Sequence, residues 1–223
     1  MKDLTLIIPA KQESGSLPDV LTEISKLKLN CKIKICLSED DKETINAIKN
    51  YDVQIMYQKK LGYGSALIEG IETNNTQFFC IFNADGSFKP TELERMYQKI
   101  KEEKIDFLFA SRYMKNSGSD DDTLITYIGN RVFSFIGKFF FKLKISDILY
   151  TFVIGDTESF KQLNIKNNDF RFCVEFPIKA KLKKFKIEEI NAYERPRIRG
   201  FKKVNALKDG WLMLVEMFKL YLK

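Results

Sequence analysis

The sequence predicts an α/β protein: a mostly parallel central sheet with helices on both faces, followed by a C-terminal amphipathic helix. Short apolar runs alternate with amphipathic segments through the first half of the 223 residues, a rhythm typical of βαβ units. In the final segment, residues 204–223, apolar residues recur at helical spacing. No repeat, low-complexity segment or Pro/Gly-rich linker interrupts the chain. We therefore expect one domain over residues 1–223.

Five strands and four helices are expected before residue 113. The strands are the apolar runs at residues 4–8, 32–37, 53–57, 78–82 and 105–110. The helices are the amphipathic segments at about residues 17–27, 41–50, 64–73 and 91–103. Pro18 and Pro90 stand where two of these helices begin, a position that suits the fixed φ angle of proline.

The second half opens with a long helix candidate at residues 123–143, which is apolar almost all round and rich in phenylalanine. Arg131 near its centre would be costly inside a bilayer, so we exclude a membrane-spanning helix. This segment and the final one at 204–223 have two interpretations. They bury their apolar faces in the protein core, or they lie at a membrane interface with lysines beside anionic lipid.

The charge of the chain favours an anionic partner. Lys and Arg number 37 against 30 Asp and Glu, which gives a net charge of +7. A nucleotide, a lipid phosphate, a membrane surface and a nucleic acid are all compatible with this excess. The basic run at residues 195–203 contains few aromatic residues, so we do not expect nucleic-acid binding.

The chain contains no histidine. This excludes His-dependent zinc sites, Ser-His-Asp and Cys-His catalysis, and imidazole acid–base chemistry. The four cysteines show no CxxC spacing, which indicates reduced thiols in a cytoplasmic protein. The apolar run near the N-terminus is too short for a signal peptide or a spanning helix.

Asp85 is the first candidate for a metal ligand. It follows the apolar run at residues 78–82 in the turn Asn83-Ala84-Asp85-Gly86-Ser87. Ligands of open α/β sheets gather at the carboxyl ends of strands, and Mg²⁺ or Mn²⁺ prefers hard oxygen ligands such as those of Asp85, Asn83 and Ser87. The alternative is an ordinary Asp-Gly turn.

Two further turns follow predicted strands. Gly62 and Gly64 permit either a close approach to a nucleotide or a purely structural turn. Glu39 and Asp40 either accept hydrogen bonds from a nucleoside or cap the helix that follows.

Taken in order, these motifs resemble those of family 2 glycosyltransferases with the GT-A fold, and most closely the dolichyl- and polyprenyl-phosphate sugar transferases. The resemblance covers nearly the whole chain. It rests on residues 7–13 (IIPAKQE), 39–40 (ED), 61–66 (LGYGSA), 83–85 (NAD), 110–113 (ASRY), Asn130, Asp147, 193–195 (YER), Gly200, Lys203 and 209–210 (DG).

The resemblance implies a division of labour between the two halves of the chain. Residues of about 1–112 would bind the nucleotide, and residues of about 113–223 would bind the acceptor. The implied nucleotide-binding residues are Pro9, Ala10, Glu13, Glu39, Asp40, Gly62, Gly64 and Asn83. The implied metal ligands are Asp85, Asn83 and Ser87. The implied acceptor-phosphate ligands are Arg112, Arg131, Arg199 and Lys203, and the implied catalytic residues are Asp85, Arg112 and Asp147.

The implied reaction is inverting transfer of a sugar from a GDP- or UDP-sugar, with Mg²⁺ or Mn²⁺, to a polyprenyl or dolichyl phosphate. Such an acceptor would place the enzyme in the cytoplasm, on the cytoplasmic face of the membrane by peripheral contact or through a membrane partner protein. A glycan hydroxyl acceptor stays open and would need a base, with Asp147 as the first candidate and Asp156 as the second. Asn83 stands where the family carries the first Asp of Asp-x-Asp, so we expect weaker metal binding, and a non-catalytic nucleotide-sugar binder also stays open.

Overall fold

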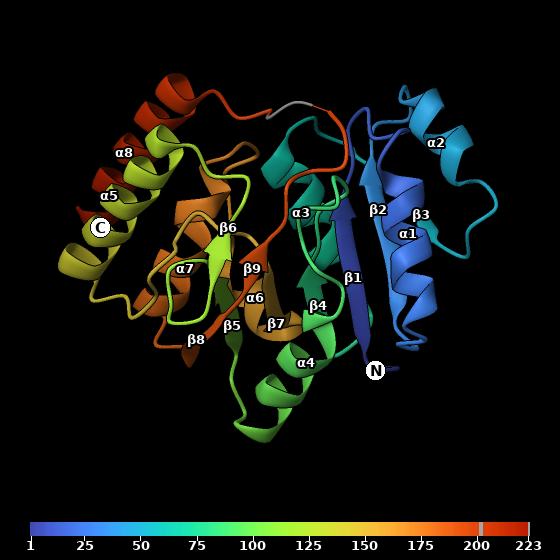
Figure 1. Cartoon of the computed structure of the whole chain (residues 1–223). Helices are drawn as coiled ribbons and strands as arrows, with labels where there is room; N and C mark the ends of the chain where they lie inside the picture. The colour runs from blue at the N-terminus through green and yellow to red at the C-terminus, as the bar shows by residue number, and fades with distance from the viewer. Residues whose placement is uncertain (201–202, 223) are drawn as a thin grey trace.

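A computed structural model describes residues 1–200 and 203–222. Its elements in chain order are β1 (Leu4–Pro9), α1 (Leu17–Lys26), β2 (Lys32–Leu37), α2 (Lys42–Ile48), β3 (Gln54–Tyr57), α3 (Tyr63–Glu72), β4 (Phe78–Ile81), α4 (Glu92–Glu102), β5 (Phe107–Ser111), β6 (Gly118–Ser119), α5 (Leu124–Phe141), β7 (Val153–Asp156), α6 (Thr157–Leu163), α7 (Phe172–Leu182), β8 (Ile187–Asn191), β9 (Tyr193–Glu194) and α8 (Ala206–Tyr221). Figure 1 shows their arrangement.

The central sheet has seven strands in the order β3-β2-β1-β4-β7-β5-β8. Strands β1, β2, β3 and β4 are parallel to one another, and β5 is parallel to β8. Strand β7 runs antiparallel to both β4 and β5. Strands β6 and β9 form a separate short parallel pair beside the main sheet.

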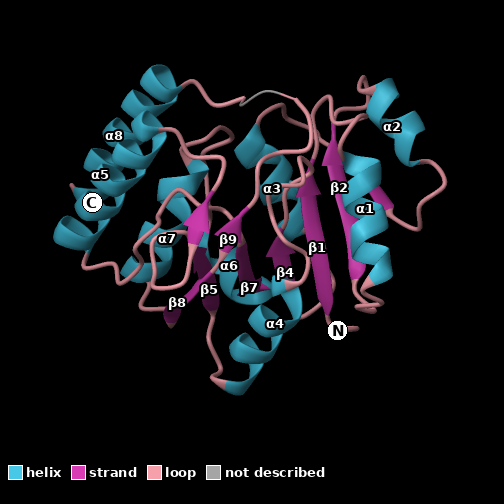
Figure 2. Cartoon of the chain, in the orientation of Figure 1, coloured by secondary structure: helices cyan, strands magenta, loops and turns pink. Residues whose placement is uncertain are grey.

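Helices cover both faces of the sheet, as Figure 2 shows. On one face, α1, α2 and α4 bury apolar side chains against the strands. On the other face, α3, α6 and α7 do the same, and α5 and α8 lie further out at one end. This three-layer arrangement confirms the predicted fold class, including the mostly parallel sheet and the C-terminal helix.

All nine elements expected before residue 113 are present, and their ends differ from the expected ones by a few residues at most. The second half also contains short elements that hydrophobic periodicity does not predict. They are β6, α6, α7, β8 and β9. The long helix α5 matches its predicted position, and α8 fills most of the predicted final segment, whose residue 223 lies outside the described residues.

The reversal of β7 determines which loops meet at the functional edge. Val153 lies opposite Ile81 at the end of β4, and Asp156 lies opposite Phe78 at its start. Because β7 runs the other way, residues that precede it lie beside residues that follow β4. The carboxyl edge of the parallel strands therefore includes the loop from α5 to β7.

Only part of the apolar surface of α5 and α8 enters the core. Phe133 and Phe141 of α5 and Met213, Met217 and Leu220 of α8 are buried. Many other apolar side chains of the two helices are exposed, so the expectation of simple core burial holds for one side of each helix. No helix within residues 1–200 and 203–222 combines the length and apolar character needed to cross a bilayer.

Candidate active site

Asp85 lies in the turn after β4, beside the point where the strand order changes direction between β1 and β4. Open α/β sheets bind ligands at such points. The Asp85 carboxylate accepts hydrogen bonds from the backbone N–H of Ser87 at 3.0 Å and from its hydroxyl at 2.7 Å. Ser87 is 1% exposed. Ser87 therefore orients the Asp85 carboxylate from the protein interior and is too buried to act as the predicted metal ligand.

A loop from the C-terminal part of the chain crosses this turn. The N–H of Arg195 donates to the carbonyl of Ser87 at 2.9 Å, and the N–H of Ile198 donates to the carbonyl of Asp85 at 2.8 Å. Gly86 has φ +82°, and a Cβ there would come within 2.5 Å of the Ile198 side chain. Glycine at position 86 thus permits both the turn and the close approach of the loop.

Arg197 brings a guanidinium to Asp85. Its Nη1 lies 3.6 Å from Asp85 Oδ2, and its Nη2 lies 2.9 Å from Asp121 Oδ2. Burial disfavours the charged guanidinium, but the Asp121 hydrogen bond and the Asp85 charge outweigh it and raise the pKa of Arg197. We call Asp85, Arg197 and Asp121 the open cluster, because 16%, 22% and 14% of their side chains are exposed.

The first loop, after β1, is held at the same edge of the sheet by contacts from two other segments. The N–H of Gln12 donates to Asp41 at 2.6 Å, and the N–H of Glu13 donates to Thr44 at 2.9 Å. Lys203 contacts both the Glu13 carboxylate and the Lys11 carbonyl. The structure thus brings the predicted Glu13 and Lys203 together.

Three acidic residues follow β2, and their contacts differ. Asp41 caps α2 and supports the first loop, which is the capping role that we considered for its neighbours. Glu39 and Asp40 are exposed at the same edge. Pro9 and Ala10 end β1 next to them, and the Ala10 N–H donates to the carbonyl of Cys36 at 2.9 Å. These predicted nucleotide contacts therefore share one rim.

The glycine turn before α3 packs against protein backbone. A Cβ on Gly62 would come within 2.1 Å of the Asn168 carbonyl, and one on Gly64 within 2.3 Å of the Asn167 carbonyl. The Ser65 N–H donates to Asn168 at 3.0 Å. The glycines accommodate this loop, as the structural alternative expects, and a nucleotide contact at Gly62 and Gly64 stays a prediction.

Arg112 sits at the centre of a second group, which we call the buried cluster: Arg112, Asp147, Glu194 and Asp122. Its Nε lies 2.7 Å from Asp147, and its Nη1 lies 2.9 Å from Glu194 and 3.4 Å from Asp122. Arg112 and Asp147 have side chains 7% and 0% exposed. Burial opposes the charge, but Asp147 and Glu194 outweigh it and raise the pKa of Arg112. Burial likewise raises the pKa of Glu194 despite Arg112.

This packing corrects two predicted roles. Asp147 holds Arg112 through both carboxylate oxygens, so as placed it has no oxygen free to take a proton from an acceptor. Three carboxylates surround Arg112 and neutralise its positive charge. Its attraction for an acceptor phosphate is therefore weak. Both residues support the site from the protein interior.

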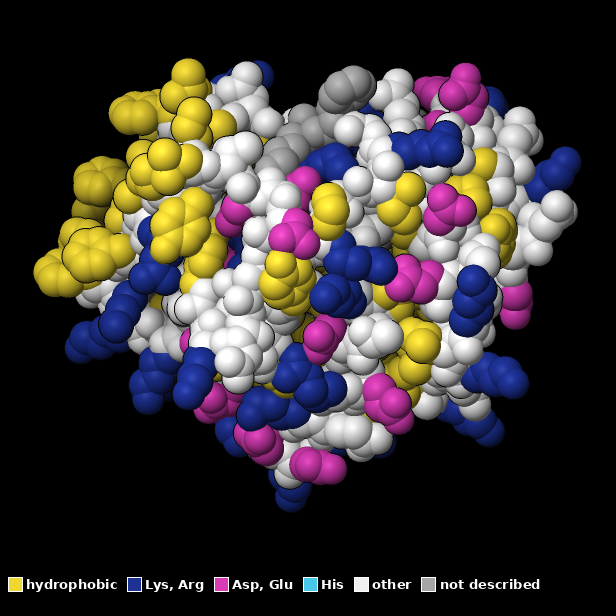
Figure 3. All heavy atoms as spheres, in the orientation of Figure 1, with side chains coloured by type: hydrophobic (Ala, Val, Ile, Leu, Met, Phe, Trp, Pro, Cys, Tyr) yellow, Lys and Arg dark blue, Asp and Glu magenta, His cyan; other side chains and the backbone are white. Residues whose placement is uncertain are grey.

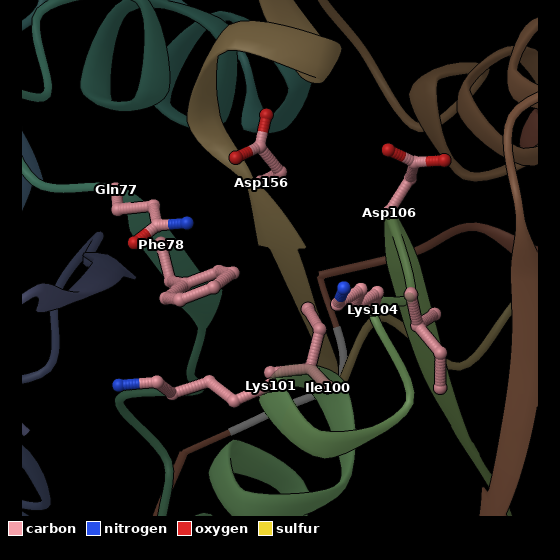
Figure 4. A pocket seen from close by; sticks show the side chains of 8 residues that line it. Gln77, Phe78, Ile100, Lys101, Lys104, Asp106 and Asp156 are labelled. Carbon is pink, nitrogen blue, oxygen red and sulfur yellow. The ribbon is translucent and has the colours of Figure 1, made fainter.

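Asp156, the second candidate base, lies at the opposite edge of the sheet. It accepts a hydrogen bond from the Ser159 N–H at 2.8 Å and caps α6. Figure 4 shows it in a hollow with Gln77, Phe78, Lys101 and Asp106. Asp106 is also engaged, with Ser159 and the Lys186 N–H. Because β7 is antiparallel, Asp156 lies at the edge of the sheet opposite to Asp85. It therefore cannot act as the general base for an acceptor bound beside Asp85.

The remaining predicted cations fall into two groups. Arg131 is exposed on α5 and lies 5.5 Å from the ring centre of Tyr113. Arg199 lies against Gly15 of the first loop, where a Cβ would come within 3.1 Å of it, and Lys203 lies beside Glu13. Arg199 and Lys203 are therefore nearer the predicted nucleotide rim than Arg131 is.

Tyr150 carries a buried hydroxyl with no hydrogen-bond partner among the described residues. Its ring packs on Phe88 at 5.0 Å, and the Arg112 guanidinium lies 4.5 Å from its centre. Burial raises its pKa, and the charges of Glu194, Asp147 and Asp85 act in the same direction. An unpaired buried hydroxyl is uncommon. A hydrogen bond from this hydroxyl to a bound donor is a hypothesis that the Tyr150→Phe variant tests.

The oxygen atoms of Asp85 and Asn83 fit a magnesium or manganese ion that a substrate phosphate also coordinates. The described residues contain no group of three or more His, Cys, Asp or Glu side chains able to hold a metal alone. Asp85 offers one carboxylate, and Asn83 lies next to it with its amide nitrogen 3.4 Å from the Ser87 hydroxyl. Magnesium is commonly held by one or two carboxylates together with substrate phosphates.

Comparisons with known proteins identify the family and the fold. The sequence model described as Glycosyl transferase family 2 matches residues 5–163. An uncharacterized glycosyltransferase of Mycobacterium bovis is 23% identical over 217 residues, which cover 97% of this chain and 96% of that protein.

Solved structures show the same fold. Glucosyl-3-phosphoglycerate synthase from Mycobacterium tuberculosis, in complex with Mn²⁺, UDP and glucosyl-3-phosphoglycerate, superposes with a TM-score of 0.76. It is 11% identical, and the match covers 98% of this chain and 79% of that one. Mannosyl-3-phosphoglycerate synthase from Rubrobacter xylanophilus gives a TM-score of 0.70 at 13% identity, over 97% and 72% of the two chains.

The chain therefore has the GT-A fold, and Asp85 lies at the switch point of its sheet. The chain belongs to glycosyl transferase family 2, and it is a glycosyltransferase. Both the predicted family and the predicted enzyme class are confirmed.

Sequence reasoning missed Arg197, Tyr150 and Asp121. Arg197 was visible only as one member of a basic run. Tyr150 has no signal in the sequence, because its unpaired hydroxyl depends on how the loop before β7 packs.

Proposed function

We propose that this glycosyltransferase moves a sugar from a GDP- or UDP-sugar, with inversion, to the phosphate of a polyprenyl or dolichyl phosphate. Residues of about 1–112 bind the donor, and residues of about 113–223 bind the acceptor, in one domain. Asp85, with Asn83, would hold Mg²⁺ or Mn²⁺, which would supply positive charge to the donor diphosphate.

The observation that carries the choice of acceptor is the engagement of the acids near Asp85. Asp147 and Glu194 neutralise Arg112, and Asp121 pairs with Arg197. A sugar hydroxyl would require one of them as a base. A phosphate monoester requires none, because its second pKa is about 6 and it is already an anion at neutral pH.

In the proposed step, a phosphate oxygen of the acceptor forms a bond to the anomeric carbon on the face opposite the leaving group. The bond from that carbon to the diphosphate oxygen breaks, and its electron pair leaves with the nucleoside diphosphate. The divalent ion, when bound, supplies positive charge to that leaving group. Arg199 and Lys203 lie on the donor rim, where they can bind the diphosphate, and Arg131 approaches the acceptor phosphate from α5.

The test combines GDP- and UDP-linked mannose and glucose, Mg²⁺ or Mn²⁺, and one of three acceptors: a short polyprenyl phosphate in detergent, 3-phosphoglycerate, or an oligosaccharide. Mass spectrometry follows the products, and donor binding is measured separately. We expect product only with the polyprenyl phosphate.

Transfer to 3-phosphoglycerate or to the oligosaccharide alone would overturn the lipid acceptor while leaving the enzyme class intact. Donor binding without transfer to any acceptor, with transfer restored by Asn83→Asp, would instead support a non-catalytic nucleotide-sugar binder. Asp19→Asn, on the exposed side of α1, serves as the matched control for Asn83→Asp.

A further inference from the structure

Helices α5 and α8 lie next to one another and expose a continuous apolar surface. Figure 3 shows it as the dense group of hydrophobic side chains over these two helices. We call it the docking face. It consists of Leu124, Ile125, Ile128, Val132, Phe135, Phe139 and Phe140 of α5, together with Leu207, Trp211, Phe218, Tyr221 and Leu222 at α8.

The exposure of these side chains is high for their size. Phe135 is 65% exposed, Trp211 is 67% exposed and Phe218 is 63% exposed. Phe140 contacts Tyr221 with ring centres 5.3 Å apart, so the surfaces of the two helices join. A contiguous apolar surface on this scale marks an interaction site and is unusual on a protein without a partner.

Helical geometry arranges these residues as two stripes. At 100° per residue, positions 124, 128, 132, 135 and 139 fall on one side of α5, and positions 207, 211, 214, 218 and 222 on one side of α8. Positions 131 and 138 fall along one border of the α5 stripe, and positions 208 and 219 along one border of the α8 stripe. Each of these border positions is Lys or Arg.

The exposed charges of the two helices have one sign. Segment 124–144 contains no Asp or Glu. In α8, Glu216 is buried, and Asp209 accepts a hydrogen bond from the Asn205 N–H at 2.7 Å. The exposed charged side chains at α5 and α8 are Arg131, Lys138, Lys142, Lys144, Lys208 and Lys219.

We propose that the docking face binds the surface of a bilayer that contains anionic lipid. An apolar face edged with aromatic rings and lysines is the pattern of helices that lie in the membrane interface. Each lysine near an anionic surface adds to the attraction. A second copy of the chain would bring the same positive border against this one, so charge disfavours self-association through this face.

Two hydrogen bonds connect helix α5 of the docking face to residues of the active site. Asn130 of α5 donates to the Tyr113 hydroxyl at 2.9 Å, and Thr126 donates to Asp122 of the buried cluster at 3.1 Å. Binding of α5 to a bilayer therefore holds Arg131 and the buried cluster beside the lipid surface. Docking requires only the surface of α5 and α8, whatever the acceptor is.

The single tryptophan of the chain, Trp211, provides a direct readout. The full chain is titrated with vesicles of phosphatidylcholine alone, or of phosphatidylcholine with 30% phosphatidylglycerol (an amount about matching an anionic leaflet), and without acceptor lipid. We expect Trp211 fluorescence to shift to shorter wavelength with the anionic vesicles, and the protein to sediment with them. Added salt should weaken the binding.

Two pairs of variants test the apolar and the cationic parts. Phe135→Gln and Phe218→Gln should each weaken vesicle binding about tenfold, and Leu182→Gln, an exposed leucine at the end of α7, should leave it unchanged. Lys138→Glu and Lys142→Glu should each weaken it at least about fivefold, whereas Lys26→Glu on α1 should not.

Three results would overturn the proposal. They are absence of binding to anionic vesicles, equal binding to neutral and anionic vesicles, and a dimer in solution that Phe135→Gln and Phe218→Gln convert to monomer. Because the vesicles contain no acceptor, a failure here is distinct from a failure of sugar transfer, and donor binding of the same preparation confirms that the site is intact.

Discussion

The buried and the open cluster both pair arginine with carboxylates at one edge of the sheet, yet they differ in how far water and ligands can reach them. Arg112 is enclosed by three acids, and its side chain is 7% exposed. Arg197 has 22% of its side chain exposed and stands 3.6 Å from Asp85. The cluster that water can enter is the one where a metal or a diphosphate can replace a protein partner, and the enclosed cluster supports its shape.

Asp85→Asn should produce the largest change. Loss of its negative charge removes the principal metal ligand, and we expect transfer to fall about a thousandfold, or about 4 kcal/mol. Sugar transfer and Mn²⁺ binding by calorimetry provide the measurements. Asp19→Asn is the control, and an unchanged Mn²⁺ affinity in Asp85→Asn would exclude the open cluster as the metal site.

Arg112→Met should lower the free energy of unfolding by about 4 kcal/mol, because it leaves the buried carboxylates of Asp147 and Glu194 without a counter-ion. Urea unfolding measures this change. Arg171→Met breaks the more exposed pair with Asp169 and should cost no more than about 1 kcal/mol. If Arg112→Met does not fold, Arg112→Lys should fold with a smaller loss. Equal effects at positions 112 and 171 would remove the distinction between the two environments.

Arg197→Met should strengthen Mn²⁺ binding in the absence of donor by about tenfold, which corresponds to about 1.4 kcal/mol. The reason is that the guanidinium occupies the space and the charge that a metal needs beside Asp85. Unfolding in urea should change little because the pair is partly exposed. Weaker Mn²⁺ binding in this variant would mean that Arg197 assists the metal and does not compete with it.

Tyr150→Phe should leave the protein at least as stable as before, because the hydroxyl it removes is buried without a partner. We expect donor affinity to fall about fivefold, since about 1 kcal/mol is typical of one hydrogen bond. Thermal unfolding and donor titration give the two numbers. A lower melting temperature with unchanged donor affinity would assign the hydroxyl a purely structural role.

Glu194→Gln should produce the smallest change, visible as a difference in pH dependence. The pKa of Glu194 is raised in the folded protein, so between its unfolded and folded pKa values the native state binds more protons. Stability therefore decreases as pH rises through that window above about 4.5. The wild type should lose stability relative to Glu194→Gln across this interval in urea unfolding at a series of pH values. A difference that does not vary with pH would mean that the pKa of Glu194 is unshifted.

Sequence patterns predicted the parallel half of the molecule well, for a physical reason. Strands buried on both faces are continuous apolar runs, as in residues 78–81, and the helices between them show clear amphipathic spacing. Strand β8, with the sequence IEEIN, lies at the edge of the sheet and is mostly half-buried, with two glutamates at its centre, so it lacks a continuous apolar run. The direction of β7 is also invisible, since apolar periodicity does not record which way a strand runs.

The candidate site was predictable where it depends on strand ends. Asp85, Glu39 and Asp40 follow parallel strands directly, so the edge they share follows from topology. The partners of Arg112 come from segments up to 82 residues away. Their mutual neutralisation depends on tertiary packing, and for this reason Asp147 looked like a base in the sequence and lies in an ion pair in the structure.

The reversed strand β7 has an evolutionary consequence. Its direction brings residues 142–152 to the same edge of the sheet as Asp85, and none of these residues belongs to a strand. The length of that stretch could therefore vary without a change in the register of strands β1 to β4. A single antiparallel strand thus separates a stretch whose length can vary from the strands that hold Asp85 in place.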